Sequence, residues 1–517
     1  MCSATDIIKA EFKEDGFFSE YLPSNFNLSN SRINIFNIKP SNKTDYIDPY
    51  KYTMSRFSKE ESRRRTIHLP ELAPYVLVSN YICDEDILSE LIDFTETYGD
   101  NSFSKLLYSD KTIYRHDKDY SNLITTTDES DLTYLPNIEK KINKAKGAKG
   151  VLHLDISNCY GSIYTHLLPS ILLGYEKSFL CFRNNGKPNL SITPQEANDY
   201  CKYKELDSKV GLLNGKRTNG LLTGSLISSF LVESFLTRID IEIERLGINF
   251  SRYVDDYEIY IYDETNIDAL TAQLREVLSK YHLDFNNEKA KFLKFPYYVV
   301  ENLQQIYSKY TRSKMTNSEL MKLFNKYFEL ENSGIKGAIR FLIKSIDDKL
   351  DLDNKVLYSS FLLNVLVNDK RSLTKVCELI ISENIEVDEK YFEIIINLLH
   401  QNIKNKNDLE VIWLIYLLKS LRKVTLGKDL LSKIIESENE LAIIMLMEEY
   451  GQEINDYNLK EDIINLNCSW ILSAQLYLKD YITKEEFSLK SEIKFNLPFY
   501  SRLRAKKFTF YKPIGTQ

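Results

Sequence analysis

The chain has 517 residues, more than one hydrophobic core usually serves, which predicts two or three domains. A hydrophobic fraction of 43%, a charged fraction of 27% and 35 Tyr residues exclude a mainly disordered or fibrous protein. The formal net charge of −7 disfavours a globally basic nucleic-acid binder, so any contact with nucleic acid must be local.

The sequence shows neither a membrane span nor a secretory signal. No apolar run approaches the roughly 20 residues that cross a bilayer, and the start of the chain lacks a basic stretch followed by an apolar one. The seven Cys form no C-x-x-C pair, which disfavours a disulfide framework and a zinc ribbon. We therefore expect a cytoplasmic protein without a membrane partner.

Residues 1–60 are rich in Asn, Ser, Asp and Tyr and show little hydrophobic periodicity, which indicates a flexible lead-in. Periodic patterning begins near Ile67, and residues 87–94 fit one face of a helix. From Gly150 the pattern changes, because residues 151–155 are typical of a buried strand.

A long apolar helix is predicted over residues 225–246. Two β-prone arms, residues 252–254 and 258–262, then form a hairpin with Asp255 and Asp256 at its turn. A helix follows from Asn266 to Tyr281.

From residue 301 to residue 493 the chain is a series of helix-length segments in which Gly and Pro nearly vanish. Serial helices are typical of an α-solenoid with HEAT-like repeats, but no strict period is present, so a helical bundle is the alternative. The predicted helices span residues 320–330, 335–346, 355–367, 373–382, 389–399, 408–421 and 430–437.

The tail, residues 494–517, interleaves aromatic and basic side chains and contains no acidic residue. Basic charge beside aromatic faces suits a single strand of nucleic acid. The alternative is a tail that docks on the acidic remainder of the protein.

Asp155 ends the predicted strand 100 residues before the hairpin pair Asp255 and Asp256, and a hairpin beside that strand brings the three carboxylates together. Clustered carboxylates repel one another and are tolerated where divalent cations compensate them; hard oxygen ligands select Mg²⁺, with Mn²⁺ as the alternative. Two such ions about 4 Å apart activate a hydroxyl and stabilise the leaving pyrophosphate in nucleotidyl transfer.

Three ordered motifs resemble the palm of the reverse transcriptases: residues 151–160, 220–225 and 253–256. A fourth, weaker match covers residues 283–289. The resemblance extends over about residues 61–300. It implies an α+β fold in which right-hand-type fingers and palm precede the all-α helical-repeat region.

The resemblance also implies roles for individual residues. Asp155, Asp255 and Asp256 are the expected catalytic and metal-binding carboxylates, and Tyr160 is expected under the sugar, where it excludes a 2′-hydroxyl. For Tyr160 the alternative is an aromatic residue packed in the palm, and for the basic residues it is a solvated charge. The expected nucleotide-binding residues are Tyr160, Arg65, Lys105, Arg115, Gly224 and Lys289.

One motif of this chain departs from the usual reverse transcriptase pattern and points to a subgroup of the family. Where the family has Pro-Gln before the second Gly, this chain has Leu222 and Thr223, so it lacks a side chain associated with holding the template base. With the long helical C-terminal half, this pattern resembles the abortive-infection (Abi) reverse transcriptases, the AbiK-like and prophage-borne type. That likeness implies phage defence by a homo-oligomer that joins dNTPs into single-stranded DNA without a template. It also implies that this DNA is covalently attached to a hydroxyl of the protein itself.

Protein priming requires a side-chain hydroxyl that reaches the metals. A tyrosine in a mobile segment can reach them more easily than one fixed in a helix. The priming candidates are Tyr46, Tyr50 and Tyr52 in the lead-in and Tyr500 and Tyr511 in the tail. For each, the alternative is a packed or surface aromatic. Two other functions are open: a templated RNA-dependent DNA polymerase of retron type, and a catalytically inactive defence scaffold.

Overall fold

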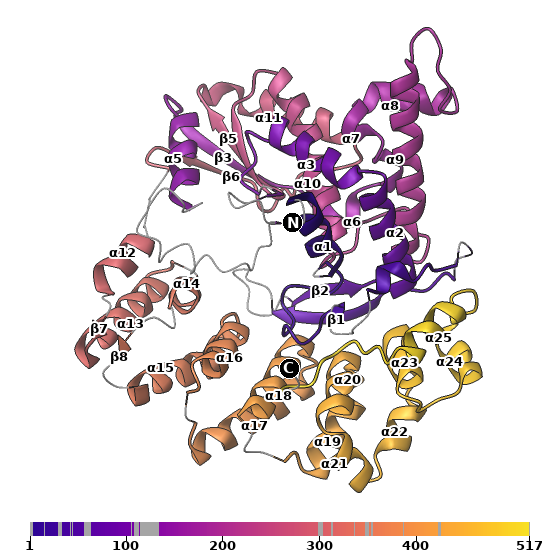
Figure 1. The fold of residues 1–517 in the computed structure, drawn as a ribbon. Helices are drawn as coiled ribbons and strands as arrows, with labels where there is room; N and C mark the ends of the chain where they lie inside the picture. The colour runs from indigo at the N-terminus through magenta and orange to yellow at the C-terminus, as the bar shows by residue number, and fades with distance from the viewer. Residues whose placement is uncertain are drawn as a thin grey trace.

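The computed structural model arranges the chain in two halves (Figure 1). The N-terminal half contains the main β-sheet, and the C-terminal half is an arc of helices beneath it (Figure 1). The structure describes residues 4–14, 16–28, 34–41, 43, 45–55, 64–104, 106–107, 113, 134–297, 303–311, 314–335, 337–346, 351–352, 355–385, 387–421 and 425–515.

A four-stranded sheet occupies the centre of the N-terminal half. Its strands are β3 (Gly150–Asp155), β4 (Phe250–Tyr253), β5 (Asp256–Ile261) and β6 (Lys291–Lys294). Their order is β4-β5-β3-β6, and every neighbouring pair is antiparallel. The predicted buried strand and hairpin are therefore confirmed, and β3 is fixed because both of its edges are paired.

Helix α10 (Leu226–Arg245) supports the sheet. It is buried along nearly its whole length, which explains why its sequence is apolar on most faces. It contacts α3 (Ile87–Tyr98), α7 (Ser170–Leu173) and α11 (Ile267–Lys280). The helices expected from periodicity in this half, α3, α10 and α11, are confirmed.

Further helices and 3-10 turns complete the N-terminal half. They are α1 (Ala4–Glu14), η2 (Ile35–Asn37), α2 (Leu72–Asp84), α5 (Tyr134–Lys144), α6 (Cys159–Ser162), η4 (Thr165–Leu167), α8 (Tyr175–Arg183), α9 (Pro194–Leu213) and η5 (Glu264–Asn266).

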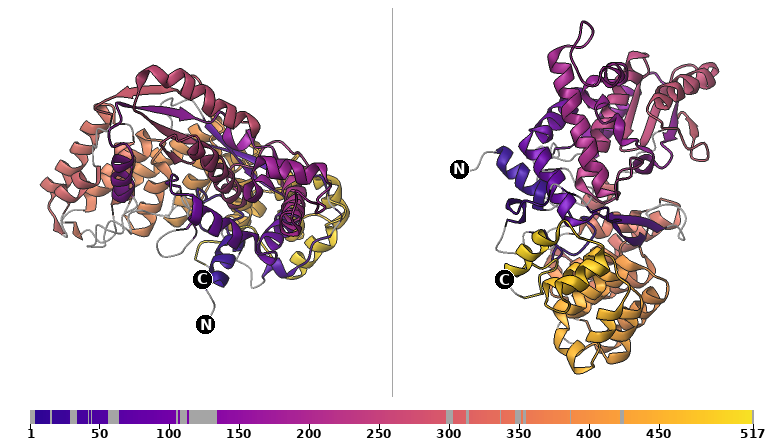
Figure 2. Two further views of the ribbon diagram at one scale, coloured as in Figure 1. Left: turned by 90° about the horizontal axis from the view of Figure 1, so that it is seen from above. Right: turned by 90° about the vertical axis from the view of Figure 1, so that its right-hand side faces the viewer.

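A two-stranded antiparallel ribbon, β1 (Tyr50–Ser55) and β2 (Arg64–Leu69), lies between the two halves (Figure 2). The Arg64 guanidinium pairs with the Glu410 carboxylate at 2.6 Å. Glu410 lies in the first turn of α18 (Asp408–Ser420), so this ion pair ties the ribbon to the helical arc.

The helical arc is built by successive contacts between neighbours, such as α13 with α14, α15 with α16 and α17 with α18. One detail of the all-α expectation is wrong, because the two-residue strands β7 and β8 pair in parallel within the arc. The elements are α12 (Leu303–Tyr310), β7 (Lys314–Met315), α13 (Asn317–Asn332), α14 (Ala338–Ser345), β8 (Asp351–Leu352), α15 (Lys355–Asn368), α16 (Leu373–Ser382), α17 (Glu389–Lys404), α18, α19 (Lys428–Glu436), α20 (Glu440–Glu449), α21 (Gly451–Asp456), α22 (Lys460–Asn465), α23 (Trp470–Leu478), α24 (Lys484–Ser491) and α25 (Leu497–Ala505).

The lead-in differs from the flexible segment that we expected. Its described residues include α1, and Phe12, Phe17 and Phe26 are buried in the main core. The Phe17 ring packs edge-on against Trp470, and the Trp413 indole donates to the Tyr21 carbonyl at 2.8 Å. The lead-in has no periodicity because its apolar side chains are buried by remote partners rather than along one regular face.

The tail also packs into the protein, as its second interpretation expected. Phe499, Phe508 and Phe510 are buried, and the backbone N–H groups of residues 494–496 all donate to the Asp45 carboxylate. The aromatic faces are therefore occupied by the core, and the interpretation of the tail as a nucleic-acid platform is wrong for these rings.

Within the described part of the chain, every helix is too short or too polar to cross a membrane.

Candidate active site

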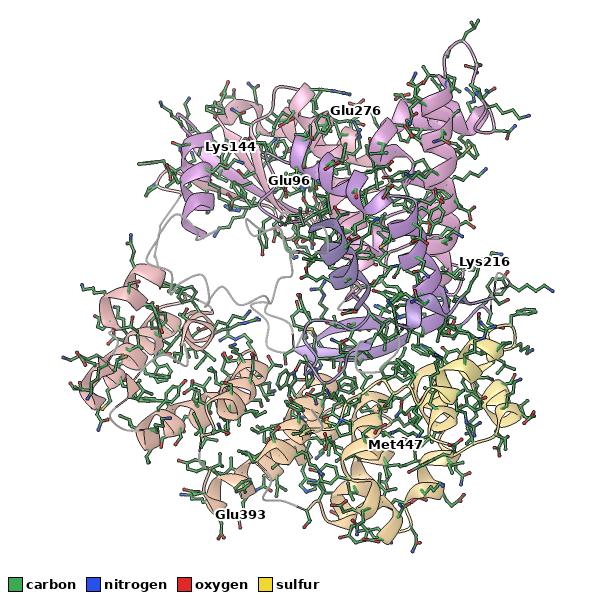
Figure 3. All side chains as sticks on the ribbon, viewed as in Figure 1. Glu96, Lys144, Lys216, Glu276, Glu393 and Met447 are labelled. Carbon is green, nitrogen blue, oxygen red and sulfur yellow. The ribbon has the colours of Figure 1, made fainter. Side chains whose placement is uncertain are left out.

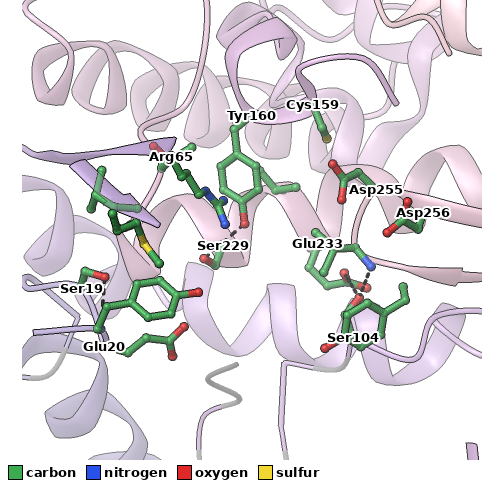
Figure 4. A pocket seen from close by; sticks show the side chains of 18 of the residues that line it. Ser19, Glu20, Arg65, Ser104, Cys159, Tyr160, Ser229, Glu233, Asp255 and Asp256 are labelled. Atoms are coloured by element: carbon green, nitrogen blue, oxygen red, sulfur yellow. Dashed lines mark hydrogen bonds between the residues drawn. The ribbon is translucent and has the colours of Figure 1, made fainter. Parts of the chain in front are cut away.

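Three aspartates meet at one end of the main sheet. Asp155 is the last residue of β3 and lies directly opposite Asp256, the first residue of β5, in the antiparallel register. Asp255 occupies the turn between β4 and β5, and its carbonyl accepts a hydrogen bond from the Ile156 amide at 3.0 Å. The structure therefore brings together the three aspartates that the motifs predicted, two of which, Asp255 and Asp256, are labelled in Figure 4.

The tight turn that presents Asp255 is strained and held from both sides. Val254 has a φ of 53°, a left-handed conformation that is costly for a β-branched residue. The Val254 amide donates to Ser104 Oγ at 2.9 Å, and the Val254 carbonyl accepts from Arg252 Nη1 at 3.0 Å. These two bonds fix the backbone that precedes the catalytic pair.

A buried charge cluster lies beneath this turn. Arg252 is fully buried and forms two hydrogen bonds to Glu233, each 2.9 Å long, and one of 2.8 Å to Asp240. The Tyr257 hydroxyl donates to the other Asp240 oxygen at 2.9 Å. A buried cation with this many charged partners is compensated only while all of them are present, so the cluster makes the turn depend on α10.

The aspartates at the sheet end have no comparable compensation. Burial, followed by repulsion from Asp155, raises the pKa of Asp255. Partial removal from solvent, with repulsion from Asp255 and Asp155, raises the pKa of Asp256 to about 7. Lys289 Nζ forms an ion pair with Asp155 Oδ2 at 2.6 Å. Mutual repulsion is the property that a bound divalent cation relieves.

The chemistry of these residues fits a hard divalent cation, whereas their side-chain positions do not form a finished site. Among the described residues, no group of three or more His, Cys, Asp or Glu side chains is close enough to hold a metal. Asp155 is engaged by Lys289 instead. Metal binding therefore requires Asp155 to exchange its lysine partner for the ion.

A cleft of about 990 Å³ opens in front of the carboxylates. Asp155, Asp255 and Asp256 line it together with Tyr160 and Arg65. Figure 4 shows the Arg65 side chain beside Tyr160, with Asp255 further along the same cleft. Positive charge and carboxylates therefore share one cavity of a size that accepts a nucleotide-scale ligand.

Tyr160 follows Asp155 through a short turn and is half-buried in the cleft wall. Its hydroxyl donates to Ser229 Oγ on α10 at 3.4 Å (Figure 4). Burial raises the pKa of Tyr160 to about 12, so the phenol is neutral near pH 7. The ring is held in one orientation within the same cavity as the aspartates.

Two of the expected nucleotide-binding residues, Gly224 and Lys289, also line the cleft. Gly224 has a φ of 98°, and a Cβ there would overlap the Ile67 side chain of β2, so the backbone itself requires glycine. Lys105 and Arg115 lie outside the described residues.

Thr223 has a structural role at the position where the resemblance leads us to expect Gln. Its hydroxyl donates to the Thr66 carbonyl at 2.8 Å, and its carbonyl accepts from the His68 amide at 2.9 Å. The short side chain thus binds the entrance of α10 to strand β2.

The five predicted priming tyrosines are absent from the described lining of this cleft. Tyr46 is exposed, but its hydroxyl accepts from Lys216, which Figure 3 shows at the outer rim of the molecule. The other four are buried side chains. They are Tyr50, whose hydroxyl accepts from the Glu440 amide; Tyr52; Tyr500, which donates to Glu71; and Tyr511, which donates to Glu449.

The expectation that these tyrosines are mobile is therefore wrong for the four buried ones. The polar composition around them suggested exposure, but their phenol rings are buried in the main core, and the hydroxyls of Tyr50, Tyr500 and Tyr511 have polar partners. Tyr21, which the sequence analysis passed over, does line the catalytic cleft.

Several other contributors to the site lack a signal in the sequence. Ser104, Glu233 and Asp240 act on the hairpin from distant positions, and no local spacing connects them with Tyr253 to Asp256. The acidic residues Glu233 and Asp240, which stand among apolar residues of α10, were the available sign that a buried partner existed.

Comparisons with known proteins give a match for the part of the chain that contains the three aspartates. Residues 111–301 match the family model "Reverse transcriptase (RNA-dependent DNA polymerase)". A search of curated protein sequences finds no match to this chain.

Among solved structures, the chain is similar to telomerase from Candida albicans in complex with a TWJ fragment of telomeric RNA, at 13% identity and a TM-score of 0.28, over 69% of this chain and 66% of that chain. It is also similar to telomerase from Candida tropicalis in complex with a TWJ fragment of telomeric RNA, at 12% identity and a TM-score of 0.32, over 77% of this chain and 62% of that chain. A third similar structure is apo telomerase from Candida tropicalis, at 11% identity and a TM-score of 0.31, over 83% of this chain and 70% of that chain.

The family match spans the strand that ends at Asp155, the loop at Gly224 and the hairpin at Asp255. Polymerases of this family join nucleotides, and the carboxylate edge provides the side chains that such chemistry requires. Residues 111–301 of this chain therefore match the reverse transcriptase domain, a family whose general chemistry is nucleotidyl transfer.

Proposed function

We propose that the chain is a DNA polymerase of phage defence, of the abortive-infection reverse transcriptase kind. The observation that carries the proposal is the carboxylate trio at one sheet end, which shares its cleft with basic side chains, among them Arg65 and Lys289, and with the Tyr160 ring. In this proposal Arg65 and Lys289 bind triphosphate charge, and Tyr160 contacts the deoxyribose.

Asp155, Asp255 and Asp256 are the proposed ligands of Mg²⁺, with Mn²⁺ as a substitute. When bound, the ions supply charge stabilisation for the attacking and leaving oxygens of nucleotidyl transfer. The protein's own contribution is to hold three carboxylates together at the sheet end against their repulsion, through the paired strands and the buried Arg252 beneath them. Lys289 then becomes available to a phosphate once a metal replaces it at Asp155.

Synthesis without a template is the second part of the proposal. It is supported by Thr223, whose hydroxyl is committed to the backbone of β2 and offers no side chain to a template base. The proposed product is single-stranded DNA made from dNTPs. The wider proposal, from the sequence resemblance, is a cytoplasmic homo-oligomer with right-hand-type fingers and palm and HEAT-like helical repeats.

Tyr21 is the proposed priming residue, in place of the five tyrosines of the sequence analysis. It is half-buried and lines the same cleft as the aspartates. It lies in a segment without helix or strand, so that side-chain rotation can move the hydroxyl, while its carbonyl is anchored by Trp413. An attacking oxygen must come within about 3.5 Å of the α-phosphate, which favours a tyrosine already in the cleft.

The test is to incubate purified protein with Mg²⁺ and one labelled dNTP, with no nucleic acid added, and then to measure the protein's mass. The proposal expects added nucleotide on a peptide that contains Tyr21, and loss of this product in Tyr21→Phe. Tyr98→Phe, an exposed tyrosine on α3, is the matched control.

Other outcomes separate the alternatives. Incorporation only with added RNA, into DNA with a free 5′ end, would establish the templated retron-type function. Label on a peptide other than that of Tyr21 would keep protein priming but reject this residue. If folded protein incorporates no nucleotide under any of these conditions, the catalytically inactive defence scaffold is the remaining function.

A further inference from the structure

A second cavity, of about 450 Å³, adjoins the catalytic cleft. The two share Ser19, Glu20 and Tyr21 of the lead-in and Arg340 and Lys344 of α14 as lining residues. Because the shared residues come from both the lead-in and the helical arc, the two cavities lie side by side at the junction of the halves. We call this second cavity the side groove.

The walls of the side groove come from two distant parts of the chain. One wall is the lead-in, with Phe18 and Phe26; the other is the helical arc, with Trp413 and Tyr416 of α18. The Tyr416 hydroxyl donates to the side chain of Asn25 at 2.8 Å, so the two walls are bonded to each other. The groove is therefore a built feature of the junction between the halves.

The charged residues of the side groove are mixed in sign. Its cations are Arg340, Lys344, Arg371 and Lys375, and its anions are Glu14, Glu20 and Glu378. Arg371 is already held by Asp369 at 2.8 Å and by Glu331 at 2.9 Å. The α14 pair, Arg340 and Lys344, lies where the side groove meets the catalytic cleft.

Arg340 and Lys344 are four residues apart on one helix, so their side chains lie on the same face. Both are half-buried, and both line the catalytic cleft and the side groove. Any chain that runs from the aspartates into the groove passes this pair. Regularly spaced cations beside aromatic side chains are the features that bind single-stranded nucleic acid through its phosphates and bases.

We propose that Arg340 and Lys344 bind the phosphates of the newly made single-stranded DNA and direct it from the catalytic cleft into the side groove. The inference rests on the proposed function, because it takes the strand made at the carboxylates as the ligand. α14 lies outside the segment 111–301 that matches the reverse transcriptase family, so this contact belongs to the helical half. It gives that half a direct part in synthesis.

A strand joined at its 5′ end to Tyr21 makes such a path necessary. Its 3′ end must stay at the carboxylates for the next addition, so each added nucleotide lengthens the DNA between two fixed points. The extra length must leave the cleft sideways. The side groove begins at Tyr21 itself and offers that direction.

The experiment compares wild type with Arg340→Ala/Lys344→Ala, and with Lys428→Ala/Lys433→Ala as a control pair on the exposed surface of α19. Each protein is incubated with Mg²⁺ and labelled dNTPs, and both the first addition and the product length are measured. We expect the α14 variant to lose far more product length than first-addition rate, and we expect wild-type lengths for the control. The conservative swap Arg340→Lys/Lys344→Arg should keep the long products.

A binding measurement keeps the inference testable if synthesis itself is not observed. Asp255→Asn protein, which carries no self-made strand, is titrated with fluorescent oligothymidylate at several salt concentrations. Removing two phosphate contacts from a single strand should lower the slope of log affinity against log salt by about 1.4.

The outcomes separate the two proposals. No dNTP incorporation by folded wild type would reject the proposed function while the titration still tests the groove. Normal incorporation with unchanged product length and unchanged salt slope in the α14 variant would overturn the groove. Preferential loss of RNA binding, with DNA binding intact, would assign the pair to a template and also overturn it.

Discussion

Two groups of carboxylates in this molecule differ in their partners. At the junction of the two halves, Asp45 accepts hydrogen bonds from the backbone N–H groups of residues 494–496. At the end of the main sheet, Asp155 faces Asp256 in register and Asp255 lies beside them. The first arrangement satisfies a negative charge, whereas the second sets negative charges against one another.

The difference separates side chains that stabilise the fold from side chains that await a ligand. A carboxylate with three backbone donors closes the tail onto the lead-in and needs nothing more. Burial and repulsion from neighbouring acids raise the pKa values of Asp255 and Asp256, and a bound cation would stabilise their charged forms. The predictions below test this contrast from its strongest consequence to its weakest.

Asp255→Asn should lower nucleotide incorporation by about 10³-fold or more, since a lost metal ligand removes several kcal/mol of transition-state stabilisation. The fold should remain, because the substitution removes a repelling charge rather than a packing group. Initial rates and thermal midpoints are measured for this variant and for Asp268→Asn, an exposed aspartate on α11. Near-normal rates in folded Asp255→Asn protein would reject the site.

Arg252→Met should destabilise the protein by about 3–5 kcal/mol, because it leaves Glu233 and Asp240 buried without their cation. Thermal or denaturant unfolding measures the loss. Adding Glu233→Gln and Asp240→Asn to the same chain removes the stranded charges and should recover most of the stability. If the single variant is as stable as wild type, the cluster does not support the turn.

Glu71 tests the junction between the halves through pH. Burial raises its pKa to about 7 from an ordinary value of 4.5, and one of its oxygens lacks a hydrogen-bond partner. The unfolded chain therefore loses this proton first, so stability falls as pH rises from about 4.5 to 7 and stays low above it. The loss is about 3 kcal/mol at most.

Glu71→Gln carries no proton to lose, so its thermal midpoint relative to wild type should improve from pH 5 to pH 8. Glu176→Gln, an exposed residue on α8, should show no such change. A Glu71→Gln difference that is the same at both pH values would mean that Glu71 is ionised, and thus satisfied, throughout.

The smallest expected effect concerns the sugar. Tyr160→Val should raise ribonucleotide use relative to deoxyribonucleotide use by about tenfold, because the shorter side chain opens room for a 2′-hydroxyl. Competition between dNTP and rNTP in one reaction gives the ratio. An active variant with unchanged sugar preference would return Tyr160 to the role of a packed palm residue, and Tyr98→Ala serves as the surface control.

The same contrast explains which parts of the structure were predictable. Asp155, Asp255 and Asp256 stand at the ends of strands whose β-propensity and alternation are local, so the sequence predicts both the strands and their meeting point. The helices from α13 to α19 follow from periodicity in the same way.

The lead-in and the tail were not predictable from local pattern. Phe17 is buried by Trp470, and Asp45 by the start of the tail, across more than 400 residues of sequence. Polar and aromatic residues without periodicity look exposed when their partners are so distant. The same holds for Ser104, which supports the catalytic turn from 150 residues away.

The most direct test of the contrast is a calorimetric titration of nucleotide-free protein with Mn²⁺. The account predicts binding to wild type and to Asp268→Asn, and loss of that binding in the double variant Asp155→Asn/Asp255→Asn. Equal Mn²⁺ binding by the folded double variant would show that the carboxylate trio is not the metal site, and would contradict the account at its centre.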